Sequence, residues 1–221
     1  PFVASLLGFE SSPVLAGCIA IALVAVTTLA NLAGTRVLSQ VAMFGFICEI
    51  GGAIVVGTFL LLFHRHQPLG VIFQTFNLGE NGNFGPAFMG AAIVGLFTCY
   101  GFEACGDVAE ETPNPGVAIP KAMKSTIYVG MSASVFVCLA LILSIPDVMA
   151  VIGGRSANPV EEALLAAFGP LGTKLVFVVV LVSFLSCALS MQAAASRLVY
   201  AYARDDMVIA SGWLGQVSGK H

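Results

Sequence analysis

Residues 99–123, CYGFEACGDVAEETPNPGVAIPKAM, decide which fold the chain is expected to adopt. They join a long apolar stretch to an acidic one, and the change comes at Gly101, Phe102 and Glu103. In one interpretation a membrane helix ends at Phe102 and the acidic residues that follow are simply solvated. In the other, the membrane part continues to about Ala109 and the backbone breaks inside the bilayer.

The composition is that of a membrane protein. Of the 221 residues, 58% are hydrophobic and only 10% are charged, against about 25% charged residues in a soluble domain. Five stretches carry no charge or nearly none, and each has the ~20 residues that a helix needs to cross a bilayer core. We therefore expect one all-α transmembrane domain over residues 1–221, with helices at about 13–33, 37–63, 85–109 (broken near 100–103), 120–146 and 171–203.

The sequence also predicts structure in the connections between these stretches. The sequence Asn158-Pro159-Val160-Glu161 has the residues of a helix N-cap, so a short helix at 159–168 is expected outside the bilayer. In the 112–116 connection, Pro113 and Pro115 indicate a turn, and Pro120 suits the first turn of the next helix.

Several classes of protein are excluded. The sequence has no basic run of the kind that binds nucleic acid. It also has neither the HExxH nor the GxSxG motif that would indicate a hydrolytic enzyme. His64 and His66 are interpreted as solvated loop side chains. The cysteines form no CxxC pair, so we interpret them as packing residues rather than disulfides or metal ligands; they are Cys18, Cys48, Cys99, Cys105, Cys138 and Cys187. No cofactor and no metal is expected.

The positive charges predict an orientation in the membrane. With five crossings, one side receives Arg36, Lys121, Lys124, Arg197, Arg204 and Lys220. The other side receives Arg65, Arg155 and Lys174. Cytoplasmic loops carry an excess of Lys and Arg. We therefore expect a multi-pass protein of the plasma membrane with cytoplasmic loops at 31–36, at 110–120 and after 204.

A break inside the bilayer would make the opening stretch a binding site. Backbone that leaves helical geometry at that depth must be buried in protein or line a wet cavity. We expect the first half-helix to end near Tyr100 and to leave the carbonyls of residues 97–100 without helical partners, at a negative dipole end that attracts an ammonium group. Gly101 supplies the conformational freedom. Glu103 is costly in the bilayer unless it is paired or protonated, which makes it a candidate for proton coupling or substrate contact.

A continuous helix would have a different meaning. Glu103, Asp107 and Glu110 would then share one face, at i, i+4 and i+7. Carboxylates on one face can bind a divalent ion, so a membrane-embedded metal-binding protein is an alternative, although no histidine lies nearby. A scaffold bundle is another. A broken third span favours a carrier, and an unbroken one favours the metal site.

Three motifs resemble those of the amino acid-polyamine-organocation (APC) permeases, in family order. GLFTCYGFEACGDVAEETPNPGVAIPKAM, residues 95–123, resembles the sixth helix of that family and the loop after it. The sequence of residues 31–36, NLAGTR, resembles the loop between the fourth and fifth helices. Residues 196–205, SRLVYAYARD, resemble the cytoplasmic end of the eighth helix. Together the motifs cover nearly the whole chain.

The resemblance implies a LeuT-like fold, in which two inverted five-helix repeats hold substrate between broken first and sixth helices. It also implies that the chain supplies helices four to eight, a partial fold that the missing helices of the same permease complete. Phe97 would cover the substrate, and the backbone at 97–102 would receive its amino group. The implied substrate-binding residues are Phe97, Thr98, Cys99, Tyr100, Gly101, Phe102 and Glu103.

The fifth helix departs from the family pattern. Many relatives place a lysine about thirteen residues after the loop arginine, and this chain has Glu49 there. Glu49 could carry a proton, pair with a cation in the missing helices, or serve packing alone. Ser186 falls in the region where sodium-dependent relatives bind their ion. Glu49, Glu103 and Ser186 are therefore the candidate ion-coupling or proton-coupling residues.

These inferences together predict a secondary active transporter in the lipid bilayer that moves amino acids or related amines by alternating access, with a proton or sodium as the coupling ion. Such a carrier needs no covalent chemistry. An uncoupled exchanger or a channel-like carrier is the alternative. The sequence does not name the substrate, because the helix that should bind its carboxylate is absent from it.

Overall fold

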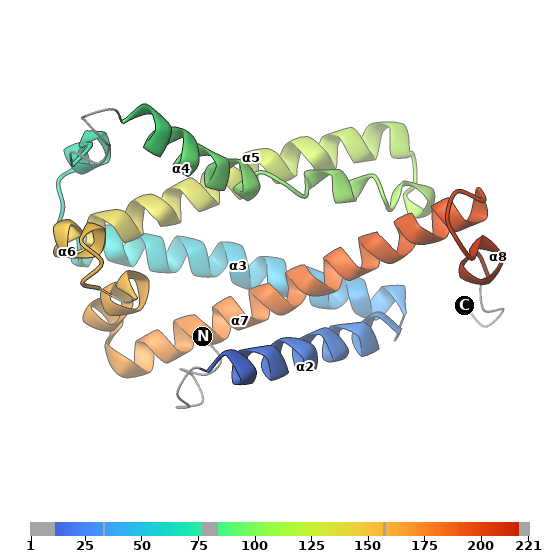
Figure 1. Ribbon diagram of the computed structural model, residues 1–221, viewed down its shortest axis with the longest axis horizontal. Coiled ribbons are helices and arrows are strands. Elements are labelled where there is room, and N and C mark those ends of the chain that lie inside the picture. The colour runs from blue at the N-terminus through green and yellow to red at the C-terminus, as the bar shows by residue number, and fades with distance from the viewer. Residues whose placement is uncertain (1–11, 33, 77–83, 157, 217–221) are drawn as a thin grey trace. The chain divides into compact units, whose positions relative to one another are not determined.

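The computed structural model describes residues 12–32, 34–76, 84–156 and 158–216. Throughout these ranges the chain forms helices and turns and no strand. Five helical segments are long and apolar enough to cross a membrane, which confirms the prediction of an all-α integral membrane protein. The long helices are α2 (Pro13–Leu32), α3 (Thr35–Phe63), α4 (Gly85–Thr98), α5 (Pro115–Ser144) and α7 (Pro159–Arg204) (Figure 1).

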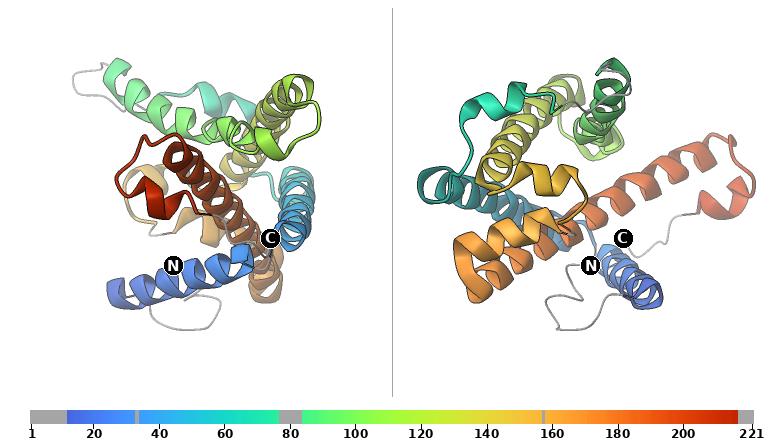
Figure 2. Two further views of the ribbon diagram at one scale, coloured as in Figure 1. Left: turned by 90° about the vertical axis from the view of Figure 1, so that its right-hand side faces the viewer. Right: turned by 60° about the vertical axis from the view of Figure 1, so that its left-hand side comes forward.

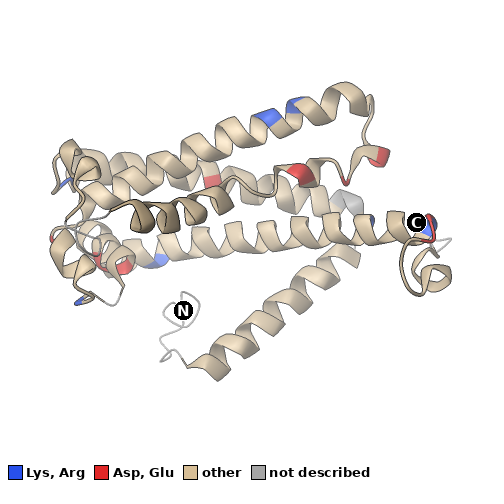
Figure 3. Cartoon of the chain, turned by 45° about the horizontal axis from the view of Figure 1, so that its top comes forward, with Lys and Arg blue, Asp and Glu red and all other residues tan. Residues whose placement is uncertain are grey.

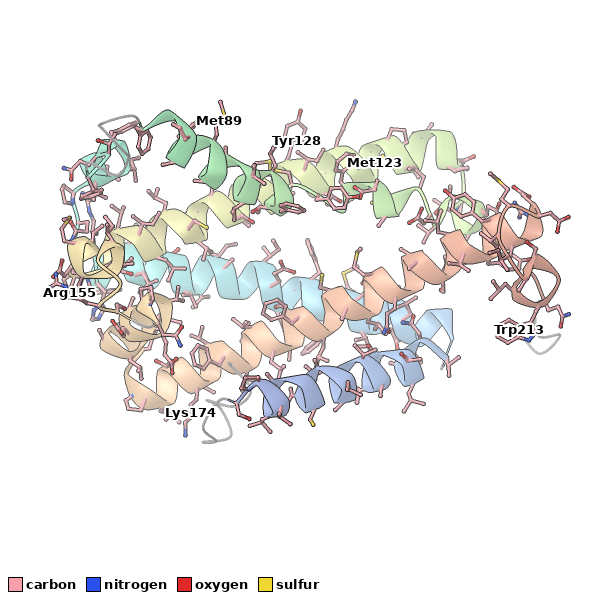
Figure 4. All side chains as sticks on the ribbon, viewed as in Figure 1. Met89, Met123, Tyr128, Arg155, Lys174 and Trp213 are labelled. Atoms are coloured by element: carbon pink, nitrogen blue, oxygen red, sulfur yellow. The ribbon has the colours of Figure 1, made fainter. Side chains whose placement is uncertain are left out.

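Short elements occupy the connections. They are η1 (Leu69–Phe73), η3 (Phe102–Cys105), η4 (Ala109–Glu111), α6 (Val148–Ile152) and α8 (Ser211–Leu214). Charged residues are sparse along the long helices and gather mainly at helix ends and in the connections (Figure 3). Large side chains stand away from the ribbon on the long helices, as Met89 on α4 and Tyr128 on α5 show (Figure 4); they are 66% and 72% exposed. Such faces are stable against lipid or further helices rather than water.

Two helix boundaries differ from the expected ones. Helix α5 begins at Pro115 rather than at residue 120, because Pro115 suits the first helical position and the amides of Val117 and Ala118 both donate to the carbonyl of Asn114. Pro120 lies inside the helix, near its start. Helix α7 includes both the expected short helix and the long span, joined by a kink at Gly169, where φ is 66° (Figure 2).

The chain folds into two compact units. The first comprises Pro1–Glu49, Glu103–Met123 and Phe177–His221, and the second comprises Ile50–Phe102 and Lys124–Val176. The backbone passes between the units within α3, within α5 and within α7. It also passes between Phe102 and Glu103, in the 3-10 turn that follows α4.

In the first unit, polar side chains join α2 to α7. The side-chain nitrogen of Asn31, Nδ2, donates to the backbone carbonyl of Leu189 at 3.2 Å and to the side-chain oxygen of Gln192 at 3.3 Å. The Gln192 side chain in turn donates to the hydroxyl of Thr28 at 3.3 Å. Side-chain hydrogen bonds of this kind stabilise helix pairs in lipid, where apolar contact alone gives little driving force.

Close packing also joins α3 to α7 in this unit. The hydroxyl of Ser186, a residue only 7% exposed, donates to the carbonyl of Ala42 at 3.3 Å. Gly45 makes this approach possible, because a Cβ atom on it would overlap the Ser186 side chain. A small residue at the contact lets two helix backbones come close.

In the second unit, α5 contacts α3 and the connection that follows α3. Gly57 of α3 faces the ring of Phe136, which a Cβ at residue 57 would overlap. The amides of His66 and Gln67 donate to the carbonyl of Leu143 at 2.8 and 3.0 Å, and the Gln67 side chain donates to the carbonyl of Ile145 at 3.0 Å. These bonds satisfy carbonyls at the C-terminal end of α5, which a helix leaves unpaired.

The histidines of this connection are less free than the sequence predicts. A ring nitrogen of His66 lies 3.1 Å from the carbonyl of Ser144. The ring of His64 stacks on Phe59, with 5.7 Å between ring centroids. His66 is nevertheless exposed and His64 is half-buried. The interpretation of solvated side chains therefore holds for His66, whereas His64 also packs on Phe59.

The contact at Gly45 generates a stability prediction. Gly45→Ala forces α3 away from Ser186, and overpacking of this kind costs about 1–3 kcal/mol, so the melting temperature of the purified full-length protein should fall. Gly51→Ala on the same helix is the matched control, because no described atom lies within 4 Å of a Cβ there. Restoring the space with Gly45→Ala combined with Ser186→Gly should recover most of the loss. Equal melting temperatures for Gly45→Ala and Gly51→Ala would contradict this account of the helix contact.

Candidate functional site

The third span is broken at the glycine of the opening stretch. Helix α4 ends at Thr98, and its last turn tightens: the amide of Cys99 donates to the carbonyl of Leu96 at 3.0 Å, and that of Tyr100 to the carbonyl of Phe97 at 3.3 Å. Gly101 follows with φ at 99°, a conformation that other L-residues rarely adopt. The break therefore lies where the sequence predicts it (Figure 1).

The segment after the break is not the α-helix expected up to residue 109. It consists of the short turns η3 and η4, and the amide of Gly106 donates to the carbonyl of Glu103 at 2.7 Å. Glycines at 101 and 106 lower the helix propensity of this stretch. Runs of 3-10 helix are short because their hydrogen-bond geometry is poorer.

The predicted row of unpaired carbonyls is wrong at its first member. The carbonyl of Phe97 accepts the amide protons of Cys99 and Tyr100. The negative end of the α4 dipole still lies at Thr98 and the residues next to it, because the peptide dipoles of the helix end there. This end of α4 is suited to a positively charged group.

At the break, two aromatic side chains are exposed, and one cysteine side chain contacts a neighbouring helix. Phe97 and Tyr100 are 72% and 74% exposed. Cys99 instead contacts α5, with its Sγ atom 2.9 Å from the Sδ atom of Met131. This sulfur contact connects the break to a helix of the same unit.

An apolar groove on α5 begins at that contact. Its volume is about 470 Å³, and its lining residues are Met131, Ser132, Val135, Phe136 and Leu139. This groove was not predicted from the sequence, although Met131, Val135 and Leu139 recur at i, i+4 and i+8 and so share one helix face. Ser132 is the polar member of an otherwise apolar lining.

The candidate coupling residues lie in the first unit. Ser186 packs against Gly45 of α3, one helical turn before Glu49, and Cys187, the next residue after Ser186, lies near Glu49. Glu49 and Ser186 are thus brought close together on α3 and α7. The side chain of Glu103 is exposed, just after the break.

The alternative metal site loses its basis. It required Glu103, Asp107 and Glu110 on one continuous helix, and the chain from 102 to 111 is a series of short turns. The carboxylate of Glu110 is bonded to Arg204. In the part of the chain that the structure describes, no three His, Cys, Asp or Glu side chains gather to hold a metal ion.

Two ion pairs follow the break, and the sequence analysis did not predict them. Glu111 accepts from Arg197, with Nε to Oε1 at 2.6 Å and Nη2 to Oε2 at 3.0 Å. Glu110 accepts from Arg204, with Nη2 to Oε1 at 2.9 Å and Nη1 to Oε2 at 3.0 Å. Both pairs are bidentate, the stronger arrangement for an arginine and a carboxylate. In each case the hydrogen bonds to the arginine lower the pKa of the glutamate below its ordinary value.

Comparison with known proteins assigns the chain to a family of membrane permeases. The profile of the amino acid permease family matches residues 2–221. The chain belongs to this family, which confirms the resemblance seen in the sequence. Its relatives are transporters and permeases rather than enzymes.

Individual relatives share about three residues in ten with the chain. It is 28% identical over 163 residues to the D-serine/D-alanine/glycine transporter of Escherichia coli K12, covering 72% of this chain and 34% of that protein. It is 33% identical over 134 residues to the lysine-specific permease LysP of Lactococcus lactis, covering 58% and 26%. An amino-acid permease of Schizosaccharomyces pombe is 29% identical over 133 residues, covering 60% and 24%.

The chain therefore spans between about a quarter and a third of the length of these relatives. No solved structure matches it.

The lowered pKa values of the two glutamates predict an acid-sensitive contribution to stability. Because both values are lower in the folded protein, the ion pairs stabilise it above the ordinary glutamate pKa of about 4.3, and this stabilisation disappears as the pH falls through the lowered values. A double variant, Glu110→Gln with Glu111→Gln, should melt below the wild-type full-length protein at neutral pH and approach it as the pH falls below the lowered pKa values. A melting-temperature difference that stays constant over that whole pH range would contradict the assignment.

Proposed function

We propose that the full-length protein containing this chain is a secondary active transporter that moves amino acids or related amines by alternating access in a LeuT-like fold. The observation that carries the proposal is the backbone break at Gly101, which follows α4 inside a segment, Gly85–Cys105, that is long and apolar enough to cross a membrane, in a chain of the amino acid permease family. Irregular backbone at membrane depth normally lines a binding site.

The break supplies a partner for the amino group of the substrate. The negative end of the α4 dipole attracts an ammonium. It lies at the carbonyl of Thr98, the last residue of the helix, next to the carbonyls of Cys99 and Tyr100 in the turn that follows. The exposed ring of Phe97 is available to cover a bound molecule. In this proposal the site residues run from Phe97 to Glu103, across the end of α4 and the break.

The names of the relatives fit a substrate with an amino group. One is a transporter for D-serine, D-alanine and glycine, and another is specific for lysine. These substrates share an α-amino and a carboxylate group and differ in the side chain. We therefore assign to the break the recognition of the shared amino group, and the substrate's carboxylate to parts of the permease beyond this chain.

Energy coupling is assigned to Glu49, Glu103 and Ser186. A membrane carboxylate that is alternately charged and neutral can carry a proton, and the hydroxyl of Ser186 is an oxygen ligand of the kind that sodium prefers. The same proposal places the protein in the plasma membrane, with the loops at 31–36 and 110–120 and the residues after 204 in the cytoplasm.

An uncoupled exchanger is the second candidate. It is favoured by Glu49, which stands where the family resemblance implies a lysine. Both candidates use the same substrate site, and they differ in whether an ion gradient drives accumulation. Uptake that exceeds equilibrium under an imposed proton or sodium gradient supports the coupled transporter. Uptake that depends only on substrate preloaded on the opposite side supports the exchanger.

The test of transport uses the full-length protein in proteoliposomes with a panel of neutral and cationic amino acids and amines. Saturable uptake of at least one compound is expected. The proposal is overturned if no member of the panel is bound or moved by protein that is folded and correctly inserted.

The coupling residues generate a separate prediction. Glu103→Gln and Glu49→Gln should each lower gradient-driven uptake by about 10- to 100-fold, the factor that corresponds to a lost charged contact worth about 1.5–3 kcal/mol. The variants should also flatten the pH dependence of uptake. Glu161→Gln, in the first turn of α7, is the control with the same change of charge. Uptake unchanged at every pH would remove both residues from the coupling role.

A further inference from the structure

The two ion pairs after the break form one anchor on a single face of α7. Arg197 and Arg204 stand at i and i+7, which places them two turns apart on the same side of a helix. Their partners, Glu111 and Glu110, are neighbours in the turn η4. All four residues belong to the first unit. Two consecutive carboxylates therefore bind two arginines on one helix face.

The pair of Arg197 and Glu111, here called the inner pair, is better held than an exposed ion pair, and the pair of Arg204 and Glu110 is called the outer pair. The side chain of Arg197 is only 20% exposed, and its Nη1 atom also donates to the carbonyl of Ala193 at 3.1 Å. The second bond holds the guanidinium in place before Glu111 binds it. The outer pair is more exposed, at 46% for Arg204 and 65% for Glu110, and exposed ion pairs contribute little. Glu111 is itself 53% exposed, so Arg197 and Glu111 form the better buried of the two pairs through the arginine.

The anchor fixes a segment that has little regular structure of its own. Between Gly101 and Glu110 the chain forms only short turns, whose hydrogen-bond geometry is poorer than that of an α-helix, and Gly106 lies close to Met123 of α5. The start of the segment is tied covalently to α4, and its end is held by the two arginines. This segment carries Glu103, a candidate for contact with substrate or a proton.

We propose that Arg197 and Arg204 are positioning residues for the broken helix: acting through Glu111 and Glu110, they hold the segment that carries Glu103 in place before substrate binds. The inference rests on the proposed transport function. Without the anchor the segment must be ordered as substrate binds, and that entropic cost appears as weaker binding. The maximal transport rate of the folded protein should change less than the affinity.

Charge reversal and charge exchange in the full-length protein test the anchor. Arg197→Glu and Glu111→Arg should each raise the KM for uptake and the Kd for substrate by about tenfold. The combined exchange, Arg197→Glu with Glu111→Arg, should return both constants to within about threefold of wild type. Lys121→Glu is the matched control, since it makes the same change of charge at a residue for which the structure records no ion pair. Rates are expressed per folded transporter, and Arg197→Gln serves where charge reversal prevents insertion.

Hydrogen exchange gives a second readout that does not depend on transport. Amides of residues 103–111 should exchange faster in Arg197→Glu or Arg197→Gln, return toward wild-type rates in the exchanged pair, and be unchanged in Lys121→Glu. The inference fails if the single variants keep the wild-type KM and exchange rates, or if the exchanged pair is no better than either single variant. Wild-type protein that neither binds nor moves a substrate would instead overturn the transport proposal, and the positioning role with it.

Discussion

The constraint on which the structure depends is the need to satisfy backbone groups inside a bilayer. A membrane helix does this by itself, and each unpaired amide in hydrocarbon costs several kcal/mol. Helix α4 stops at Thr98, within a span long enough to cross the membrane. The amides of Cys99 and Tyr100 turn back to the preceding carbonyls, and Gly101 changes the chain direction. The helix therefore breaks where a break is costly, and it does so at the C-terminal end of α4, whose negative dipole end favours a cation.

The break is supported on each side by a different helix. In the second unit, Cys99 contacts Met131 of α5, next to an apolar groove. In the first unit, the turn after the break is held on α7 through Glu111 and Arg197. In each unit, the irregular segment thus contacts one regular helix.

The sequence predicted the features that depend on local chemistry. Hydrophobic length identified five spans, and the glycine within GFE placed the break, because only glycine readily adopts the positive φ found at Gly101. It did not predict that Arg197 binds Glu111, because these residues are 86 positions apart and only the packing of α7 brings them together. It also missed the carbonyl of Phe97 as an acceptor, because tightening of a last helical turn leaves no mark in composition.

The most direct test of the central claim is a structure of the full-length permease with a bound amino acid. The account predicts that the substrate's ammonium lies within about 3 Å of a backbone carbonyl between Thr98 and Gly101, a hydrogen-bond distance, with Gly101 still at positive φ. A substrate bound elsewhere, or a third span that continues as an unbroken helix through Glu103, would contradict it.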